Sequence, residues 1–192
     1  MKIAIVGAHG VGKTTLTKVV EQETNLAAPI PTPMHNPAPG ETKSLQECSN
    51  AEVLRLSQRR YTERIVQEHS RPDIVSDGSV LHEWVYAATK LRLGIFPDHT
   101  TSDARDSAAQ TYLALVREFT AEALAYTQDT YDAIFFIPIE FSLPRENPPI
   151  SDRFQTEASE TLHEALSTLS KPVHLLSGSP QTRIRQLLVA LG

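Results

Sequence analysis

A glycine-rich segment near the N-terminus has the spacing of a phosphate-binding loop. It reads Gly7-x-x-x-x-Gly12-Lys13-Thr14. Glycines let the backbone curl so that successive N–H groups point at phosphate oxygens, and a following helix adds the positive end of its dipole. We expect Lys13 to reach the β- and γ-phosphates and the Thr14 hydroxyl to hold Mg²⁺. The segment therefore predicts a nucleoside triphosphate site. The residues expected to contact the nucleotide here are Gly7, His9, Gly10, Val11, Gly12, Lys13, Thr14 and Thr15.

The residues on either side of the loop support this interpretation. Residues 2–6 are a β-branched run, which is typical of a buried parallel strand. Residues 13–23 carry Leu16, Val19 and Val20 at helical spacing. Because strand, loop and helix follow one another in the order that the motif requires, a chance match in a glycine-rich turn is the weaker explanation.

Asp77 closes a second β-branched run. Residues 72–79 indicate a buried strand that ends in an acidic turn. A carboxylate at a strand end that faces the phosphate loop can accept the proton of an acceptor hydroxyl or order Mg²⁺. Asp77 is therefore a candidate catalytic and metal-ordering residue. The alternative is that it only caps the helix that begins near Ser79.

Two arginines accompany a proline-rich segment later in the chain. Arg145 lies among the prolines of residues 138–149, and Arg153 lies just beyond them. Arginines on a mobile segment can close over phosphates as charge moves during transfer. We therefore predict a short lid at about residues 139–153, open until phosphates bind, with Arg145 and Arg153 as catalytic residues.

The rest of the chain alternates helical and strand patterns. Further helices are expected over about residues 49–68, 80–91, 102–124, 154–169 and 180–189, and further strands over residues 133–138 and 173–176. This alternation predicts one domain over residues 1–192, a three-layer α/β/α sandwich with a parallel sheet. Residues 26–40 carry five prolines and read as a loop, in which residues 27–30 are a short edge strand or part of the connection. This loop either borders a substrate pocket or is a plain surface connection.

Some helical side chains have two readings. Trp84 belongs to an apolar stripe, so a place in the core is favoured over stacking on a base. Gln58, Arg59 and Arg60 lie mid-helix, where an amide or guanidinium can meet a substrate. Solvated helix charges are the commoner explanation for such residues.

Composition narrows the class of protein. The chain has 192 residues, a formal net charge of −5 and one cysteine, Cys48. One cysteine excludes an intramolecular disulfide and a multi-cysteine metal site, and the seven histidines show no metal-ligand spacing. The negative charge argues against a duplex nucleic-acid partner. There is no apolar run of membrane-spanning length and no signal-like start, so we expect a cytoplasmic protein without a membrane partner.

The phosphate loop alone is compatible with several classes of nucleotide-binding protein. The sequence lacks the Asn-Lys-x-Asp segment by which GTPases read their base. A small kinase needs a carboxylate at a strand end and arginines on a lid, and the sequence offers candidates for both. The alternative is a regulatory P-loop ATPase that binds or slowly hydrolyses ATP without a small-molecule acceptor.

The combined pattern resembles AAA-type P-loop domains related to bacterial ribosylnicotinamide kinases and, more distantly, to deoxynucleoside and nucleoside monophosphate kinases. The likeness covers most of the chain and is strongest in residues 7–15. Residues 74–79 are similar to a family strand that ends in Asp-Arg-Ser, and residues 131–138, 151–153 and 175–179 resemble its fourth strand, lid and adenine-side loop.

The resemblance implies roles for particular residues. By this likeness Asp77 is the catalytic or metal-ordering acid, Arg153 is a lid arginine, and Gly178 and Ser179 are neighbours of the base. It implies an ATP- and Mg²⁺-dependent kinase with a small nucleoside- or nucleotide-like acceptor, and a homodimer is compatible with it.

The sequence departs from the family pattern on the acceptor side. Gly78 stands where the family usually has arginine. The segment after the first helix offers prolines, Met34 and His35 where acidic residues or arginines are often found. The identity of the acceptor and the choice between ATP and GTP are therefore left open.

Overall fold

The computed structural model describes residues 1–29, 40, 42–96, 107–144 and 146–192. In these residues four strands form one parallel sheet in the order β2-β1-β3-β4. The strands are β1 (Lys2–Gly7), β2 (Ile74–Asp77), β3 (Ala133–Ile137) and β4 (Val173–Leu175). The helices are α1 (Lys13–Glu23), α2 (Asn50–His69), α3 (Val80–Leu93), α4 (Ser107–Thr130), α5 (Asp152–Ser167) and α6 (Pro180–Leu191).

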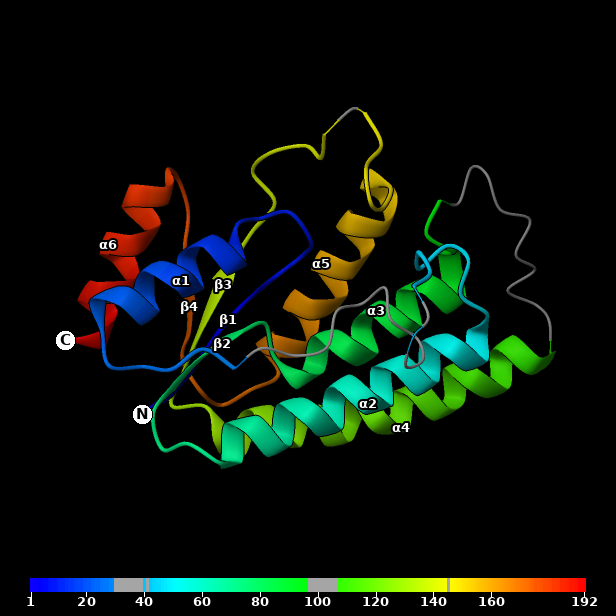
Figure 1. Cartoon of the computed structure of the whole chain (residues 1–192), viewed down its shortest axis with the longest axis horizontal. Coiled ribbons are helices and arrows are strands. Elements are labelled where there is room, and N and C mark those ends of the chain that lie inside the picture. The colour runs from blue at the N-terminus through cyan, green and yellow to red at the C-terminus, as the bar shows by residue number, and fades with distance from the viewer. Residues whose placement is uncertain (30–39, 41, 97–106, 145) are drawn as a thin grey trace.

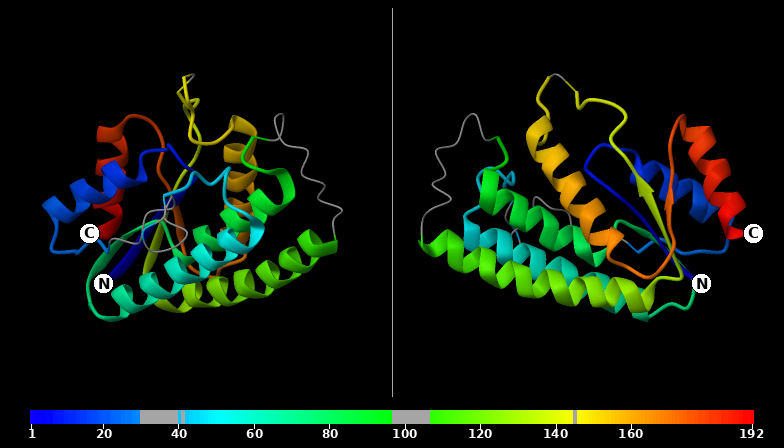
Figure 2. Two further views of the ribbon diagram at one scale, coloured as in Figure 1. Left: turned by 45° about the vertical axis from the view of Figure 1, so that its right-hand side comes forward. Right: turned by 180° about the vertical axis from the view of Figure 1, so that it is seen from behind.

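The sheet separates two hydrophobic cores. Ile3 and Ile5 of β1 belong to the core shared with α1 and α6, whereas Ala4 and Val6 belong to the core shared with α2 to α5. This alternation follows from the opposite directions of successive side chains along a strand. Figure 1 shows α1 and α6 on one side of the strands and the other helices on the opposite side, and the turned views of Figure 2 agree. The predicted three-layer parallel α/β/α fold is confirmed.

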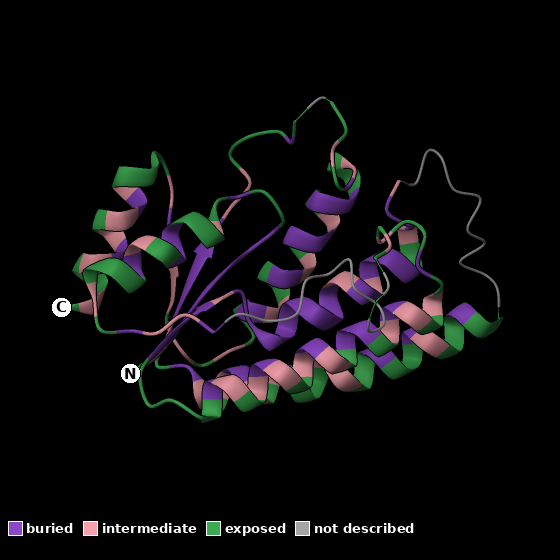
Figure 3. Cartoon of the chain, in the orientation of Figure 1, coloured by how far each residue is buried: buried purple, intermediate pink, exposed green. Residues whose placement is uncertain are grey.

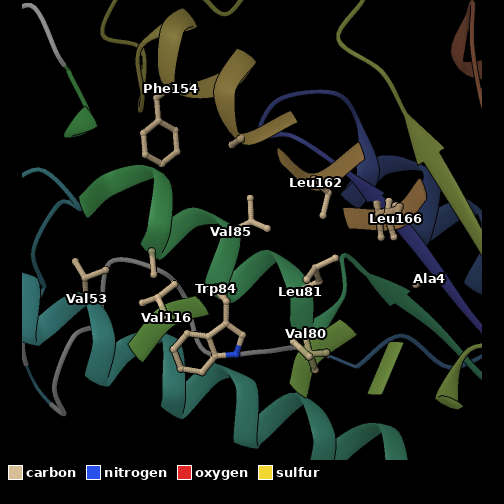
Figure 4. Close-up of a cluster of buried hydrophobic side chains, with 14 of the residues drawn as sticks. Ala4, Val53, Val80, Leu81, Trp84, Val85, Val116, Phe154, Leu162 and Leu166 are labelled. Atoms are coloured by element: carbon tan, nitrogen blue, oxygen red, sulfur yellow. The ribbon is translucent and has the colours of Figure 1, made fainter. Parts of the chain in front are cut away.

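The larger core is built around α3, which is enclosed by α2, α4 and α5. Trp84 is 1% exposed, and its ring stacks on Phe119 at a centroid distance of 4.5 Å. Figure 4 shows its indole among apolar side chains of neighbouring helices, and Figure 3 shows the buried strands and inner helix faces. Trp84 is therefore a core residue, as favoured from the sequence.

Some predicted bounds differ from the structure. α5 begins at Asp152, two residues before the predicted start, because the Ser151 hydroxyl accepts a hydrogen bond from the Phe154 N–H and caps the helix. Of the two alternatives for residues 27–30, the described part, residues 27–29, shows one parallel bridge between Ala27 and Ile74 and no longer strand. The rest of the proline-rich loop, with Met34 and His35, and the predicted helix start near residue 102 lie outside the described residues. None of the described helices is long and apolar enough to cross a membrane.

Candidate functional site

The glycine-rich loop and Asp77 meet at one edge of the sheet. β1 and β2 are parallel neighbours in which Ile5 pairs with Asp77, so the chain leaves both strands at the same edge. This is the edge at which open α/β sheets bind ligands. The Thr14 hydroxyl donates a hydrogen bond to Asp77 Oδ2 at 2.6 Å. Two residues 63 positions apart in the chain thus place their oxygens together.

Asp77 does not cap the following helix. The N-cap of α3 is Ser79, whose backbone N–H donates to His82 Nδ1 at 3.0 Å. The Asp77 carboxylate instead accepts a hydrogen bond from the Thr14 hydroxyl. The capping interpretation of Asp77 is therefore wrong.

The backbone of the loop depends on its glycines. Gly12 has φ of 98°, in the left-handed region that side chains disfavour. A Cβ on Gly7 would lie 2.5 Å from the carbonyl oxygen of Ile137 in β3. A side chain at Gly7 would therefore force the loop away from the sheet.

Two helices far along the chain hold the outside of the loop. Gln155 of α5 is buried, and its Nε2 donates to the His9 carbonyl at 2.6 Å. Arg183 of α6 is 6% exposed, and its Nη1 donates to the Val11 carbonyl at 2.7 Å. These contacts satisfy two carbonyls of the loop, and an anion would be bound by its N–H groups.

Lys13 is half-buried at the start of α1. Its ammonium donates to the Ala8 carbonyl at 2.7 Å, within the loop. Burial lowers the pKa of Lys13 to about 8, the Asp77 carboxylate opposes this effect, and Arg64 adds to it. Burial and the neighbouring Lys13 also lower the pKa of His9. The loop therefore holds a lysine whose charge is sensitive to a nearby anion.

A buried arginine supports the strand end that carries Asp77. Arg64 of α2 is 2% exposed. Its guanidinium donates to Ser76 Oγ at 2.7 Å and to the Asp77 carbonyl at 3.2 Å. Ser76 Oγ in turn donates to Glu68 Oε1 at 2.6 Å. These contacts fix the backbone from which the Asp77 side chain projects.

Arg60 is not a solvated helix charge. Its Nε lies 2.6 Å from Oε2 of Glu83, and its Nη2 lies 3.1 Å from Oε1 of the same carboxylate. Glu83 is 1% exposed, so this is a buried two-point ion pair between α2 and α3. Removing one partner of such a pair typically costs about 3–5 kcal/mol because the other charge is left uncompensated. The interpretation favoured from the sequence is wrong for Arg60, whereas Gln58 is exposed.

The predicted base-side residues are tied to the loop. The Gly178 N–H donates to both carboxylate oxygens of Glu140, at 2.9 and 3.0 Å. Glu140 also accepts from Arg183 Nη2 at 2.9 Å, and these donors lower its pKa. Ser179 is the N-cap of α6. A cavity of about 110 Å³ lies beside them, lined by Gly12, Thr15, Leu16, Val19, Pro180, Arg183 and Ile184.

Of the two predicted lid arginines, only Arg153 lies among the described residues. Arg153 is exposed in the first turn of α5, the helix whose Gln155 contacts the loop. Arg145 lies outside the described residues. Leu143 and Ile150 of the predicted lid are buried, so only part of this segment projects into solvent.

We predict that the exposed part of this segment is cut by protease and protected by ligand. Phe141 is 69% exposed, whereas Phe154 is 1% exposed and serves as an internal control. Brief chymotrypsin digestion should cleave after Phe141 and spare Phe154. A non-hydrolysable ATP analogue with Mg²⁺ should slow the cut at Phe141, followed by mass spectrometry. Equal cleavage with and without the analogue would count against a closing lid.

Sequence comparison identifies the family. A model described as an AAA domain matches residues 2–183. The chain belongs to the AAA domain family. Among curated proteins, no sequence matches it. The P-loop AAA resemblance found in the motifs is confirmed.

Solved structures share the fold of this AAA domain. Deoxyadenosine kinase from M. mycoides with bound dATP has a TM-score of 0.69 at 15% identity and is similar over 100% of this chain and 99% of its own. Thymidylate kinase from Candida albicans has a TM-score of 0.63 at 14% identity, over 99% and 90%. NadR protein in complex with NR has a TM-score of 0.64 at 18% identity, over 99% of this chain and 49% of its own. At such identities the similarity establishes a kinase-like fold.

Proposed function

We propose that this AAA domain is an ATP- and Mg²⁺-dependent kinase that phosphorylates a small nucleoside- or nucleotide-like acceptor. The observation that carries the proposal is the 2.6 Å contact between the Thr14 hydroxyl and the Asp77 carboxylate, next to Lys13. It brings a phosphate loop and an acid to one point at the carboxyl edge of the sheet. Both are parts that phosphoryl transfer requires.

The donor set at this point suits Mg²⁺. Thr14 and Asp77 offer a hydroxyl and a carboxylate oxygen, the hard ligands that Mg²⁺ prefers. No group of three or more acidic, histidine or cysteine side chains in the described part of the chain forms a metal cage. This agrees with a cation held by one or two protein oxygens together with phosphates. Bound there, Mg²⁺ would neutralise charge on the β- and γ-phosphates.

Each candidate residue has a separate role in phosphoryl transfer. Lys13 binds the β- and γ-phosphates and stabilises charge on the transferring group. Asp77 orders the cation or takes the proton of the acceptor hydroxyl. Arg153, and by sequence Arg145, close over the phosphates and exclude water. Gly178 and Ser179 border the donor base near the cavity between α1 and α6.

The acceptor is expected on the α2 and α3 side of Asp77. Tyr86 of α3 has a buried hydroxyl without a hydrogen-bond partner among the described residues. Burial raises its pKa, and Glu83 and Asp77 add to the effect, so the hydroxyl remains a donor. A buried donor without a partner is costly, and a polar acceptor molecule that displaced the side chains covering this hydroxyl would satisfy it. The similar structures named as deoxyadenosine and thymidylate kinases support a nucleoside-like compound.

A panel of nucleosides and nucleoside monophosphates tests the proposal. Purified protein is incubated with ATP and Mg²⁺ and each compound, and the products are read by mass spectrometry. A kinase forms ADP in step with one phosphorylated acceptor. Little ADP whatever is added would favour the regulatory ATPase instead. Omitting Mg²⁺, or replacing ATP by GTP, tests the metal and the donor.

A further inference from the structure

His82 is a buried histidine whose two ring nitrogens are both engaged. It lies in the first turn of α3 and is 5% exposed. Nδ1 receives the Ser79 backbone N–H at 3.0 Å, so Nδ1 is the unprotonated nitrogen. Nε2 lies 2.9 Å from the Gly7 carbonyl oxygen, and the Gly7 backbone N–H points at the same nitrogen at 3.2 Å. Nε2 can make only one of these two bonds, because it either donates or accepts. With Nδ1 accepting from Ser79, Nε2 carries the hydrogen, and we assign the shorter contact as a hydrogen bond donated to the Gly7 carbonyl.

The surroundings keep this ring neutral. Burial lowers the pKa of His82 well below 6.5, and Lys13 and Arg64 lower it further. The edge-on ring of Tyr86 packs against it at a centroid distance of 5.9 Å. A neutral imidazole is required here, because a doubly protonated ring has no lone pair to receive the Ser79 N–H.

The ring joins the two turns that form the phosphate site. Gly7 ends β1 and opens the glycine-rich loop, and Ser79 lies two residues after Asp77. Gly78, between Asp77 and Ser79, has φ of 89°, and a Cβ on Gly78 would lie 3.3 Å from His82 Nδ1. The ring thus fills the space where a side chain at Gly78 would begin.

We propose that His82 is a positioning residue of the phosphate site, whose donated hydrogen bond fixes Gly7 and thereby the spacing of the loop from Asp77. The inference deepens the proposed function and rests on it. Capping α3 requires only the contact between His82 and Ser79, so the cap does not explain why the ring also contacts Gly7. The Gly7 contact is the part that reaches the loop.

Two substitutions separate these contacts. In His82→Asn the side-chain oxygen lies near the place of Nδ1 and can still receive the Ser79 N–H, but no group reaches Gly7. In His82→Gln the terminal amide reaches the place of Nε2 and can donate to Gly7, and while it does so it does not receive the Ser79 N–H. His163→Asn, on the exposed face of α5, is the matched control.

The readout is binding, so that it does not depend on finding the acceptor. A fluorescent ATP analogue is titrated into each protein in the presence of Mg²⁺, and the melting temperature of each protein is measured. His82→Asn should melt lower, because the Gly7 carbonyl is left without its donor, and should bind about tenfold more weakly, the scale of one hydrogen bond. His82→Gln should bind within about threefold of the wild type, on the same scale, and melt lower. Unchanged affinity in His82→Asn, or equal loss in both variants, overturns the inference.

Two further outcomes complete the test. Wild-type protein that fails to bind the analogue would overturn the proposed function and this inference with it, whereas failure of the variants alone overturns only the inference. Nitrogen-15 NMR of wild-type His82 needs no variant to fold. It should show a neutral ring with hydrogen on Nε2 between pH 6 and 8, about the range in which ordinary histidines titrate. A charged ring, or hydrogen on Nδ1, contradicts the assignment.

Discussion

Replacing Lys13 by alanine should abolish phosphotransfer while leaving the fold intact. The ammonium is the cation that the loop motif places against the transferring group, and loss of such stabilisation typically costs about a hundredfold or more in rate. The folded protein loses the hydrogen bond from the ammonium to the Ala8 carbonyl. Turnover is measured with the acceptor found in the nucleoside panel, and folding by circular dichroism.

Lys18→Ala is the matched control, because Lys18 is an exposed lysine of the same helix. It should behave as the wild type. Near wild-type turnover in Lys13→Ala would show that the loop does not hold the transferring phosphate, and the site would have to be sought elsewhere.

The pKa of Lys13 predicts how nucleotide affinity depends on pH, in the wild type and in Lys13→Ala. Burial lowers this pKa to about 8, so the ammonium is largely charged at pH 7 and loses its proton as pH rises through that value. A triphosphate favours the charged form, so the affinity of the wild type should fall above about pH 8. In Lys13→Ala this loss should be absent. Calorimetric titration at several pH values measures both.

The second large effect is expected at Asp77. Asp77→Asn should keep ATP affinity and melting temperature but lose phosphotransfer by about a hundredfold or more, the scale of a positioned base. The asparagine oxygen can still accept the Thr14 hydroxyl, so the contact at 2.6 Å has a neutral equivalent. The amide offers no negative charge to Mg²⁺ and takes no proton.

Kinetics of Asp77→Asn are compared with those of Asp129→Asn, a change of the same kind on the exposed face of α4. Varying Mg²⁺ separates the two roles of Asp77. Activity recovered at high Mg²⁺ indicates an ordering acid, whereas activity lost at every Mg²⁺ concentration indicates a general base. Full turnover in Asp77→Asn would remove Asp77 from the mechanism.

The parts of the site that sequence predicts are those with a local signature. The loop is encoded by glycine spacing within eight residues, and Asp77 by its place at the end of a β-branched run. Their meeting required only that β1 and β2 be neighbours, which the parallel sheet provides. The layers followed likewise from alternation of strand and helix patterns.

The residues that support the loop could not be predicted in this way. Gln155 and Arg183 contact the loop from 146 and 172 positions away, and nothing in their local sequence distinguishes them from ordinary helix residues. Arg60 and Arg64 did carry a signal. Together with Glu68 they recur every four residues along one face of α2, and this face is buried. Of these residues only Arg60 was considered from the sequence, and it was interpreted as a solvated charge because partners on other elements are invisible in sequence.

The contact from α6 to the loop has a consequence for how the chain holds together. Arg183 binds the Val11 carbonyl directly and, through Glu140, the turn at Gly178. A ligand that binds the native form preferentially stabilises that form. Because α6 holds the loop in its native form, a ligand that contacts only the loop also favours the folded state of α6. Fraying of the C-terminus and occupancy of the nucleotide site are thus opposing events in one equilibrium. A fragment ending after β4 would retain the whole glycine-rich motif and Asp77 and yet have lost this linkage.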